Sequence, residues 1–163
     1  MTGLVFRSAK VVLTGAQTEE ECKRAALRIC RRINYAVYRN AETTKLNLPY
    51  GFHVHNFKIE NVVGTFQIPH QLKLNVLYNE WKTANNENVI LLENLQLKKI
   101  IYDPEHFPGL RMQYITDVDN AVRRRIMCML FNNGKCIVTG SKCEAYAKKF
   151  SYQLYLSAIR YSK

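Results

Sequence analysis

Residues 126–142 read IMCMLFNNGKCIVTGSK, and this stretch decides the fold. The apolar run 126–131 leads into Asn133-Gly134, and a second apolar run follows over 136–139. Asn-Gly is the strongest short-range signal for a β-hairpin, because both residues tolerate a positive φ. The stretch therefore predicts a hairpin whose second strand is broken at Gly140, with a helical pattern beginning a few residues later.

The same unit occurs near the start of the chain. Residues 4–15 align without a gap to residues 129–140 at a constant offset of 125, and the register continues into the following helical pattern. The identical pairs are Phe6/Phe131, Lys10/Lys135, Thr14/Thr139, Gly15/Gly140, Glu19/Glu144 and Lys23/Lys148. An ungapped repeat with identities at turn and strand-end positions indicates two copies of one hairpin–helix unit.

Both faces of the predicted hairpin are apolar. Successive side chains of a strand point to opposite faces, so Ile137 and Thr139 share one face while Cys136 and Val138 share the other. The helices that follow the hairpins are expected to cover one face. The second face then requires a further helical layer, a partner or an apolar ligand, and the remaining sequence predicts no spare helices for such a layer.

These residues resemble the TATA-box-binding protein family. The pattern Phe-x-x-x-Lys-x-x-x-Thr-Gly after an apolar strand occurs twice. Residues 57–64 are similar to the family's first strand, with its DNA-contacting Asn and Val, and residues 102–110 are similar to the stirrup that carries an intercalating Phe. The resemblance implies an α+β fold: a curved antiparallel sheet shaped like a saddle, with helices on its convex face and two pseudo-symmetric repeats, the first incomplete.

The repeats are expected to be unequal. We expect 1–35 to be the second half of repeat 1, 36–56 a linker, and 57–163 a complete repeat 2 with insertions near 69–88 and 116–125. Only two residues precede Gly3, so the first repeat lacks its first strand, first helix and stirrup. Either the protein is a reduced form of the family, or Met1 is an internal methionine of a longer chain.

The individual elements follow from local patterns. Helices are expected over 18–33, 89–101 and 143–161, and strands over 57–68 and 107–115, in addition to the two hairpins. Thr18 with Glu21 three residues later predicts a capping box at the start of the first helix. The helix over 143–161 is predicted to bury an apolar stripe formed by Tyr146, Phe150, Leu154 and Ala158.

Composition favours a basic globular protein without catalytic chemistry. The net charge of +11 and the pI near 9.6 indicate an anionic partner, usually nucleic acid, although a merely basic surface is the alternative. The five cysteines lie in apolar patterns without a Cys-x-x-Cys pair, which predicts reduced core residues. His53 and His55 lack further ligands nearby. We expect no enzyme activity, no cofactor and no metal.

By resemblance, DNA lies on the open face of the sheet through its minor groove. There A·T and T·A base pairs present only acceptors, which suits an apolar surface with few, short polar groups. The Phe residues would act as wedges that bend the DNA, although core packing is the alternative for the two hairpin Phe side chains. Lysines, with Arg111, would contact phosphates. The expected DNA-binding residues are Leu4, Phe6, Lys10, Val12, Thr14, Asn61, Val63, Phe107, Met129, Phe131, Lys135, Ile137, Thr139 and Lys142.

The resemblance also implies protein partners. The stirrup residues Asp103, Glu105 and His106 are expected to contact a protein similar to transcription factor IIB. The basic helix face is expected to meet regulators or flanking DNA, or else is simply solvated. Its residues are Lys23, Arg24, Arg28 and Arg31.

The implied function is that of a general transcription initiation factor. It would bind TATA or A·T-rich promoter DNA, bend it, and recruit transcription factor IIB, RNA polymerase and other basal factors, in the nucleus or in a viral transcription compartment. One alternative is a truncated protein-interaction module or regulator that has lost DNA binding. Another is a non-catalytic domain of a repair or RNA-processing enzyme.

Overall fold

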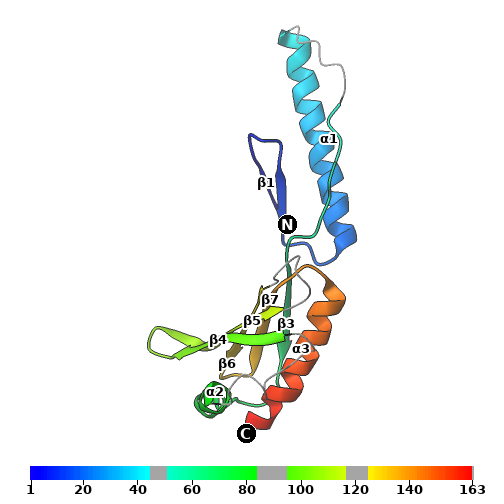
Figure 1. Ribbon diagram of the computed structural model, residues 1–163. Coiled ribbons are helices and arrows are strands. Elements are labelled where there is room, and N and C mark those ends of the chain that lie inside the picture. Colours follow the sequence, from blue (N-terminus) through cyan, green and yellow to red (C-terminus); the bar gives the residue numbers. More distant parts are fainter. Residues whose placement is uncertain (45–50, 84–94, 117–124, 163) are drawn as a thin grey trace. The chain divides into compact units, whose positions relative to one another are not determined.

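The structure is a computed structural model that describes residues 1–44, 51–83, 95–116 and 125–162. The chain divides into two compact units, Met1–Lys58 and Ile59–Lys163, and each contains its own antiparallel sheet (Figure 1). Within the described ranges, no helix combines the length and the apolar character needed to cross a membrane.

The first unit is a hairpin followed by one long helix. Strands β1 (Thr2–Val5) and β2 (Val11–Thr14) pair, and α1 (Glu19–Thr44) follows. The predicted capping box forms in part: the backbone N–H of Glu21 donates to Thr18 Oγ1 at 3.1 Å, while Glu21 Oε2 accepts from the backbone N–H of Gln17, one residue before the cap, at 2.8 Å. A Cβ at Gly3 would lie 2.6 Å from Ile29 Cδ1, so α1 packs closely on this face of the hairpin.

Helix α1 runs well past its predicted end near residue 33 and reaches Thr44. Asn34, which follows the predicted end of the helix, lies inside α1, and its side chain hydrogen-bonds to a later segment. The backbone N–H of Phe52 donates to Asn34 Oδ1 at 2.6 Å, and Asn34 Nδ2 donates to the Phe52 carbonyl at 2.8 Å. We call this pair of bonds the Asn34–Phe52 clamp. It satisfies the amide, so Asn34 does not compete with the helical backbone bonds.

The second unit contains the larger sheet. Its strands are β3 (Val62–Gln67), β4 (Leu95–Asp103), β5 (Phe107–Thr116), β6 (Arg125–Phe131) and β7 (Lys135–Ser141). They pair antiparallel in the order β3-β7-β6-β5-β4. Its helices are α2 (Leu74–Thr83), α3 (Glu144–Ala158) and the short 3-10 turn η1 (Ile159–Tyr161). The predicted second hairpin and the C-terminal helix are therefore confirmed.

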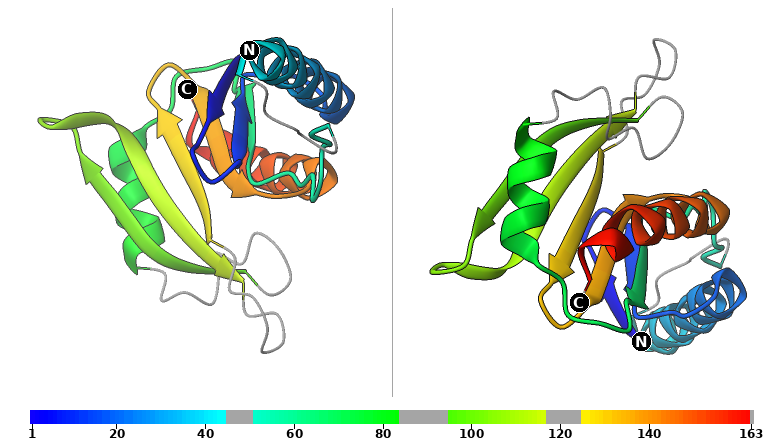
Figure 2. Two further views of the ribbon diagram at one scale, coloured as in Figure 1. Left: turned by 90° about the horizontal axis from the view of Figure 1, so that it is seen from above. Right: turned by 90° about the horizontal axis from the view of Figure 1, so that it is seen from below.

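One face of this sheet carries the core. Helices α2 and α3 lie on the same side of the sheet (Figure 2). The predicted stripe of α3 is confirmed for Phe150, Leu154 and Ala158, which are fully buried, while Tyr146 packs at the edge of the core. The Tyr114 ring of β5 meets Phe150 edge-on, with ring centroids 5.2 Å apart. The expected α+β fold, a curved antiparallel sheet with helices on one face, is thus confirmed.

Three sequence predictions for this unit were wrong or too broad. The helix expected over 89–101 is replaced by β4, whose alternating burial begins with buried Leu95 and Leu97. The expected insertion over 69–88 contains α2, and its side chains Leu74, Leu77 and Trp81 belong to the core. The strand expected over 57–68 begins only at Val62. Residues 117–124, in the second expected insertion, lie outside the described residues.

The two hairpins share one pairing register. In the first, Thr2 pairs with Thr14 and Leu4 with Val12. In the second, the equivalent residues at the offset of 125 also pair, Met127 with Thr139 and Met129 with Ile137. The following helices begin at the equivalent residues Glu19 and Glu144. The sequence repeat is therefore also a repeat of backbone structure.

Candidate nucleic-acid interface

Among the described residues of the second unit, no helix covers the face of the five-stranded sheet opposite the core. Cys136 and Val138 are fully buried, whereas Ile137 and Thr139 between and beside them remain partly exposed. The strand register extends this face across the sheet through a row of paired residues. We call it the open face, and its side chains include Val63, Thr65, Ile101, Arg111, Gln113, Met127, Met129, Phe131, Ile137 and Thr139.

The open face is mostly apolar and yet accessible. Val63 retains 60% of its side-chain exposure, and Met127, Met129 and Ile137 are half-buried. Exposed apolar surface of this extent usually marks a binding site. Its polar groups are hydroxyls, amides and the Arg111 guanidinium, with Lys99 and Lys135 at register positions on the same face, so most of the face can make close contact with a ligand that offers few hydrogen-bonding groups.

Phe107 and Phe131 form an aromatic pair at one end of the open face. Their ring centroids are 5.8 Å apart and the rings are inclined at 61°. Gly109, which pairs with Phe131 across the β5–β6 ladder, makes this arrangement possible. A Cβ at Gly109 would lie 2.7 Å from Phe107 Cε1 and 3.0 Å from Phe131 Cε1. Because Gly109 has no side chain, the rings of Phe107 on β5 and Phe131 on β6 can pack against each other.

Asn61 and Thr139 belong to two separate sequence motifs, and the structure brings them together. The backbone N–H of Gly140 donates to Asn61 Oδ1 at 2.8 Å, and Asn61 Nδ2 lies 3.0 Å from Thr139 Oγ1. Thr139 Oγ1 also lies 3.2 Å from Asn61 Oδ1. Because Oδ1 accepts the backbone bond, the orientation of the amide is fixed and its N–H₂ group is held beside the Thr hydroxyl.

The predicted phosphate contacts differ in their surroundings. Lys135 is exposed at the start of β7. Lys142 Nζ lies 3.6 Å from Glu60 Oε2, with both side chains about half exposed, so this cation is already partly neutralised. The guanidinium of Arg111 lies over the Phe107 ring, 5.2 Å from its centroid.

The predicted DNA-binding residues of the first unit also share one face. Leu4, Val12 and Thr14 alternate with Gly3 and Leu13, so they lie on the side of the hairpin away from α1. The turn that follows β1 is closed by the backbone bond from Phe6 N–H to the Lys10 carbonyl, 2.9 Å. Leu4 and Phe6 keep 53% and 48% of their exposure.

The predicted partner-binding residues lie at the β4–β5 turn and along α1. At the turn, His106 Nδ1 lies 2.9 Å from Asp103 Oδ2, and Glu105 between them is exposed. On α1, Lys23 Nζ contacts Glu19 at 2.9 Å, which raises the pKa of the lysine through that hydrogen bond and charge. Arg24, Arg28 and Arg31 are exposed.

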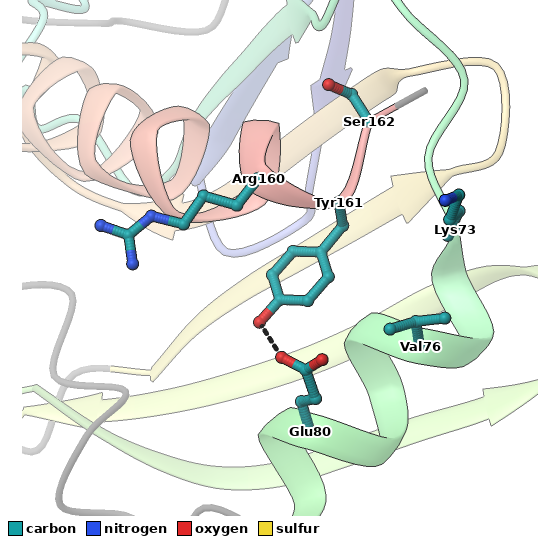
Figure 3. Close-up of a pocket in the computed structure, with 6 residues that line it drawn as sticks. All are labelled: Lys73, Val76, Glu80, Arg160, Tyr161 and Ser162. Atoms are coloured by element: carbon teal, nitrogen blue, oxygen red, sulfur yellow. Dashed lines mark hydrogen bonds between the residues drawn. The ribbon is translucent and has the colours of Figure 1, made fainter.

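The buried thiols and the pocket supply no catalytic chemistry. Burial raises the pKa of Cys136 to about 12 and raises that of Cys128 well above its usual range, so both thiols stay protonated in the core. No group of three metal-ligating side chains occurs among the described residues. A pocket between α2 and η1 holds the hydrogen bond from Tyr161 to Glu80 Oε2, 2.7 Å, with Lys73 and Arg160 at its rim (Figure 3). Its residues include no activated nucleophile.

Several open-face residues were missed from the sequence. Thr65, Gln113, Met127 and Ile101 belong to the face through cross-strand pairing with residues that were identified. For Met127 the sequence did contain a signal, because the repeat aligns it with Thr2, which lies on the equivalent face of the first hairpin. It was absent for Ile101, because β4 was predicted to be a helix.

Comparisons with known proteins agree with this architecture. Residues 56–157 match the protein-family model described as "Transcription factor TFIID (or TATA-binding protein, TBP)". The chain is 30% identical over 141 residues to the TATA-box-binding protein of Dictyostelium discoideum, covering 86% of this chain and 52% of that protein. It is 28% identical over 162 residues to the TATA-box-binding protein of Tetrahymena thermophila, covering 99% and 52%. The chain thus spans about half the length of these two relatives.

A solved structure shows the same fold. The Methanococcus jannaschii TBP matches with a TM-score of 0.54 and 25% sequence identity, over 97% of this chain and 70% of that one. The family is one of transcription factors rather than enzymes, which confirms the expectation that this chain is not an enzyme. Because the family model covers most of the chain, including all five strands of the larger sheet, the chain belongs to the TATA-binding protein family.

Proposed function

We propose that this protein is a transcription factor that binds the minor groove of TATA-like, A·T-rich DNA with the open face of its sheet. The observation that carries the proposal is the open face itself. It keeps Val63, Met129 and Ile137 accessible beside the fixed pair Asn61–Thr139, with two aromatic rings at one end. The family membership and the net charge of +11 support it.

The chemistry of the open face suits the minor groove better than the major groove. In the minor groove, A·T and T·A pairs show only the N3 and O2 acceptors, while G·C adds a donor amine. The Asn61 amide can donate to such acceptors because its Oδ1 is occupied by Gly140 N–H. The apolar side chains around it require no hydrogen-bonding groups from the base edges, so an A·T-rich groove satisfies the whole face.

The Phe107–Phe131 pair is proposed to bend the DNA by entering a base step. Inserting apolar wedges unstacks bases at a cost of a few kcal/mol per step, and the bend brings more DNA against the protein. TATA-binding proteins are the general example of this mode of binding. The pair is suited to it because Gly109 places both rings side by side and leaves them partly exposed.

The remaining surfaces are proposed to contact proteins. The β4–β5 turn with Asp103, Glu105 and His106 is the proposed contact for a protein similar to transcription factor IIB, which would recruit RNA polymerase. The exposed arginines of α1 are proposed to meet other basal factors. We propose a nuclear location, because the curated relatives named above come from organisms whose promoters lie in a nucleus.

A second function rests on the first unit. None of residues 1–39 and 51–58 is fully buried, and the first hairpin exposes Leu4, Val5 and Phe6. This apolar hairpin favours a protein-interaction module that binds another chain through strands β1 and β2. Such a module would retain partner binding without binding DNA.

A competition experiment separates these two functions. The protein is titrated with a fluorescent A·T-rich duplex at fixed salt, and then with a minor-groove drug or a major-groove ligand. We expect the drug to displace the protein and the major-groove ligand to leave it bound. Displacement by the major-groove ligand alone would contradict minor-groove binding, whereas no DNA binding at all would reject the proposed function and favour the protein-interaction module.

The wedge role is tested on the same complex by energy transfer between dyes at the duplex ends. Phe107→Ala and Phe131→Ala are expected to abolish most of the bend while unfolding free energy falls by less than the roughly 3–5 kcal/mol typical of a core Phe. Tyr152→Ala is the control, because Tyr152 is 63% exposed on α3, the helical side of the sheet. A stability loss of core size would instead assign the two rings to structural packing.

A further inference from the structure

Arg111 occupies an unexpected place on the open face. It pairs with Met129 of β6 and with Ile101 of β4, and its chain neighbours Leu110 and Met112 are fully buried in the core. Its side chain therefore emerges among apolar neighbours in the row Thr65–Ile137–Met129–Arg111–Ile101. It is the one charged residue in that row, so its environment differs from that of the exposed Lys135.

The arginine is incompletely satisfied. Its Nε atom is buried and makes no hydrogen bond with any described residue. The guanidinium lies 5.2 Å from the centroid of the Phe107 ring, on which it can stack through a cation–π contact. A buried donor without an acceptor is unfavourable, and every polar atom of a guanidinium is a donor. The guanidinium is therefore held beside the Phe107–Phe131 pair with its Nε–H donor lacking a protein acceptor, and a ligand that offers an acceptor there would satisfy it.

Resting on the proposed function above, we propose that Arg111 is a specificity-determining residue. It donates to the minor-groove acceptors, adenine N3 or thymine O2, of the base pair next to the step that Phe107 and Phe131 enter. The stacking contact with Phe107 sets its position, so the residue that enters the DNA also places the residue that reads the adjoining pair. A G·C pair there would direct its N2 amine at the guanidinium, donor against donor.

This assignment differs from a phosphate contact. Phosphate contacts position a protein without reading sequence, and they suit exposed cations such as Lys135. Arg111 emerges from the middle of β5 within the apolar surface that would face the base edges. Arginine is also the side chain most often drawn into a narrow A·T minor groove.

The test scans one duplex by single base-pair changes. Each A·T pair of the binding site is replaced in turn by G·C or by inosine·C, which lacks the guanine amine and so presents only acceptors in the minor groove. Affinities at fixed salt are compared for the wild-type protein, Arg111→Met, Arg111→Lys and Lys135→Met. Methionine keeps an unbranched apolar stem like that of Met129, and thermal melts verify that each variant is folded.

For the wild-type protein, we expect G·C at one position beside the wedge step to weaken binding by roughly tenfold, with inosine·C tolerated there. Arg111→Met should lose this discrimination at that position alone. Arg111→Lys should restore little of it, because lysine lacks the planar fork of donors. Lys135→Met should weaken binding to all duplexes alike and reduce the salt dependence by about one phosphate contact.

Two results would overturn the assignment. Equal weakening of every duplex by Arg111→Met, with rescue by Arg111→Lys, would make Arg111 a phosphate contact while leaving the proposed minor-groove binding intact. Absence of DNA binding by the folded wild-type protein would reject the proposed function and the assignment together.

Discussion

The two hairpin–helix units have the same local structure and very different packing. Equivalent residues pair in both hairpins, both helices begin with a glutamate, and each helix carries the same Glu–Lys pair, 2.9 Å in α1 and 2.7 Å in α3. Yet Phe150, Leu154 and Ala158 of α3 are fully buried, whereas no residue of 1–39 or 51–58 is. A hairpin and a helix therefore do not make a core by themselves.

The difference comes from the neighbours of each hairpin. In the second unit β7 also pairs with β3, and β6 also pairs with β5, so neither strand is an edge. In the first unit, β1 and β2 pair only with each other among the described residues. A two-stranded hairpin alone is at best marginally stable, and three or more strands with an apolar face, or packing against a helix, are needed for independent stability. The strands β3 and β5, which flank the second hairpin, lie outside the repeated hairpin–helix sequence, so the repeat does not encode these contacts.

The largest expected effect comes from the helix residues that face each hairpin. Leu154 and its repeat equivalent Ile29 differ in burial, because Leu154 is fully buried and Ile29 is half-buried. We expect Leu154→Ala to lower the unfolding free energy by about 2–5 kcal/mol. Ile29→Ala should lower only the hydrogen-exchange protection of α1.

The single tryptophan makes this measurement specific. Trp81 is buried in the second unit and donates to Tyr161 Oη at 3.2 Å, so its fluorescence during denaturation reports on that unit. An equally large loss of the fluorescence-monitored stability in Ile29→Ala would mean that the two units share one folding transition, and the comparison would fail.

A smaller effect on stability is expected when the turn residue of each hairpin is substituted. Gly134 has φ +81° and its equivalent Ala9 has φ +62°, so both adopt the left-handed conformation that favours glycine. A Cβ at Gly134 would collide with the Ile68 carbonyl oxygen and approach His70 O to 2.8 Å. Gly134→Ala should therefore cost roughly 1–3 kcal/mol from the backbone conformation, and more from the collision.

Ala9→Gly is the matched variant. It relieves strain of about 1–2 kcal/mol and loses about 0.4–1 kcal/mol through the more flexible unfolded chain, so its net effect should be small. Both variants are measured by chemical denaturation and α1 hydrogen exchange. A tolerated Gly134→Ala would show that the second turn is as unconstrained as the first.

The smallest expected effect concerns the repeated ion pair, which should be alike in both units. The hydrogen bond from Lys148 lowers the pKa of Glu144, and that bond raises the pKa of Lys148. The stability that Glu144 contributes to the folded protein is therefore present above the ordinary carboxyl pKa, and it is lost as pH falls through the lowered pKa. The stability that Lys148 contributes is present below the ordinary lysine pKa, and it is lost as pH rises through the raised pKa.

Glu144→Gln and Glu19→Gln should each change helix stability less than either glycine exchange, and by similar amounts, because both pairs are exposed. Melting curves followed from neutral pH into acid would measure this, with the difference between Glu144→Gln and wild type shrinking as pH falls through the lowered carboxyl pKa. A clearly larger effect of Glu144→Gln would show that packing strengthens the pair in the second unit.

The sequence predicted the elements whose periodicity and turn chemistry agree. The hairpin over 126–142 combines two continuous apolar runs with Asn133-Gly134, and the structure follows this prediction closely. The strand β4 was missed because the pairing register shifts between Leu97 and Lys99, so the alternation that begins at Leu95 does not continue along the strand. A bulge of this kind interrupts the period on which a strand prediction depends.

The open face was only partly predictable for a related reason. The motif residues Asn61, Ile137 and Thr139 could be identified from the resemblance, and the structure brings Asn61 to Thr139. The partial burial of Arg111 depends on its cross-strand neighbours in β4 and β6, which no local pattern reveals. Likewise, helix α2 was overlooked although Leu74, Leu77 and Trp81 have helical spacing, because the polar residues around them suggested an insertion.

The Asn34–Phe52 clamp has a consequence for how the chain tolerates changes of length. It joins two positions 18 residues apart and so closes a loop of chain, in the polymer sense, whose first part is the end of α1. Doubling the length of a flexible closed loop adds only about 0.6 kcal/mol of closure entropy. Extra residues inserted between Thr44 and Phe52 should therefore add little closure entropy, while Phe57 beyond the clamp stays next to Lys23 of α1.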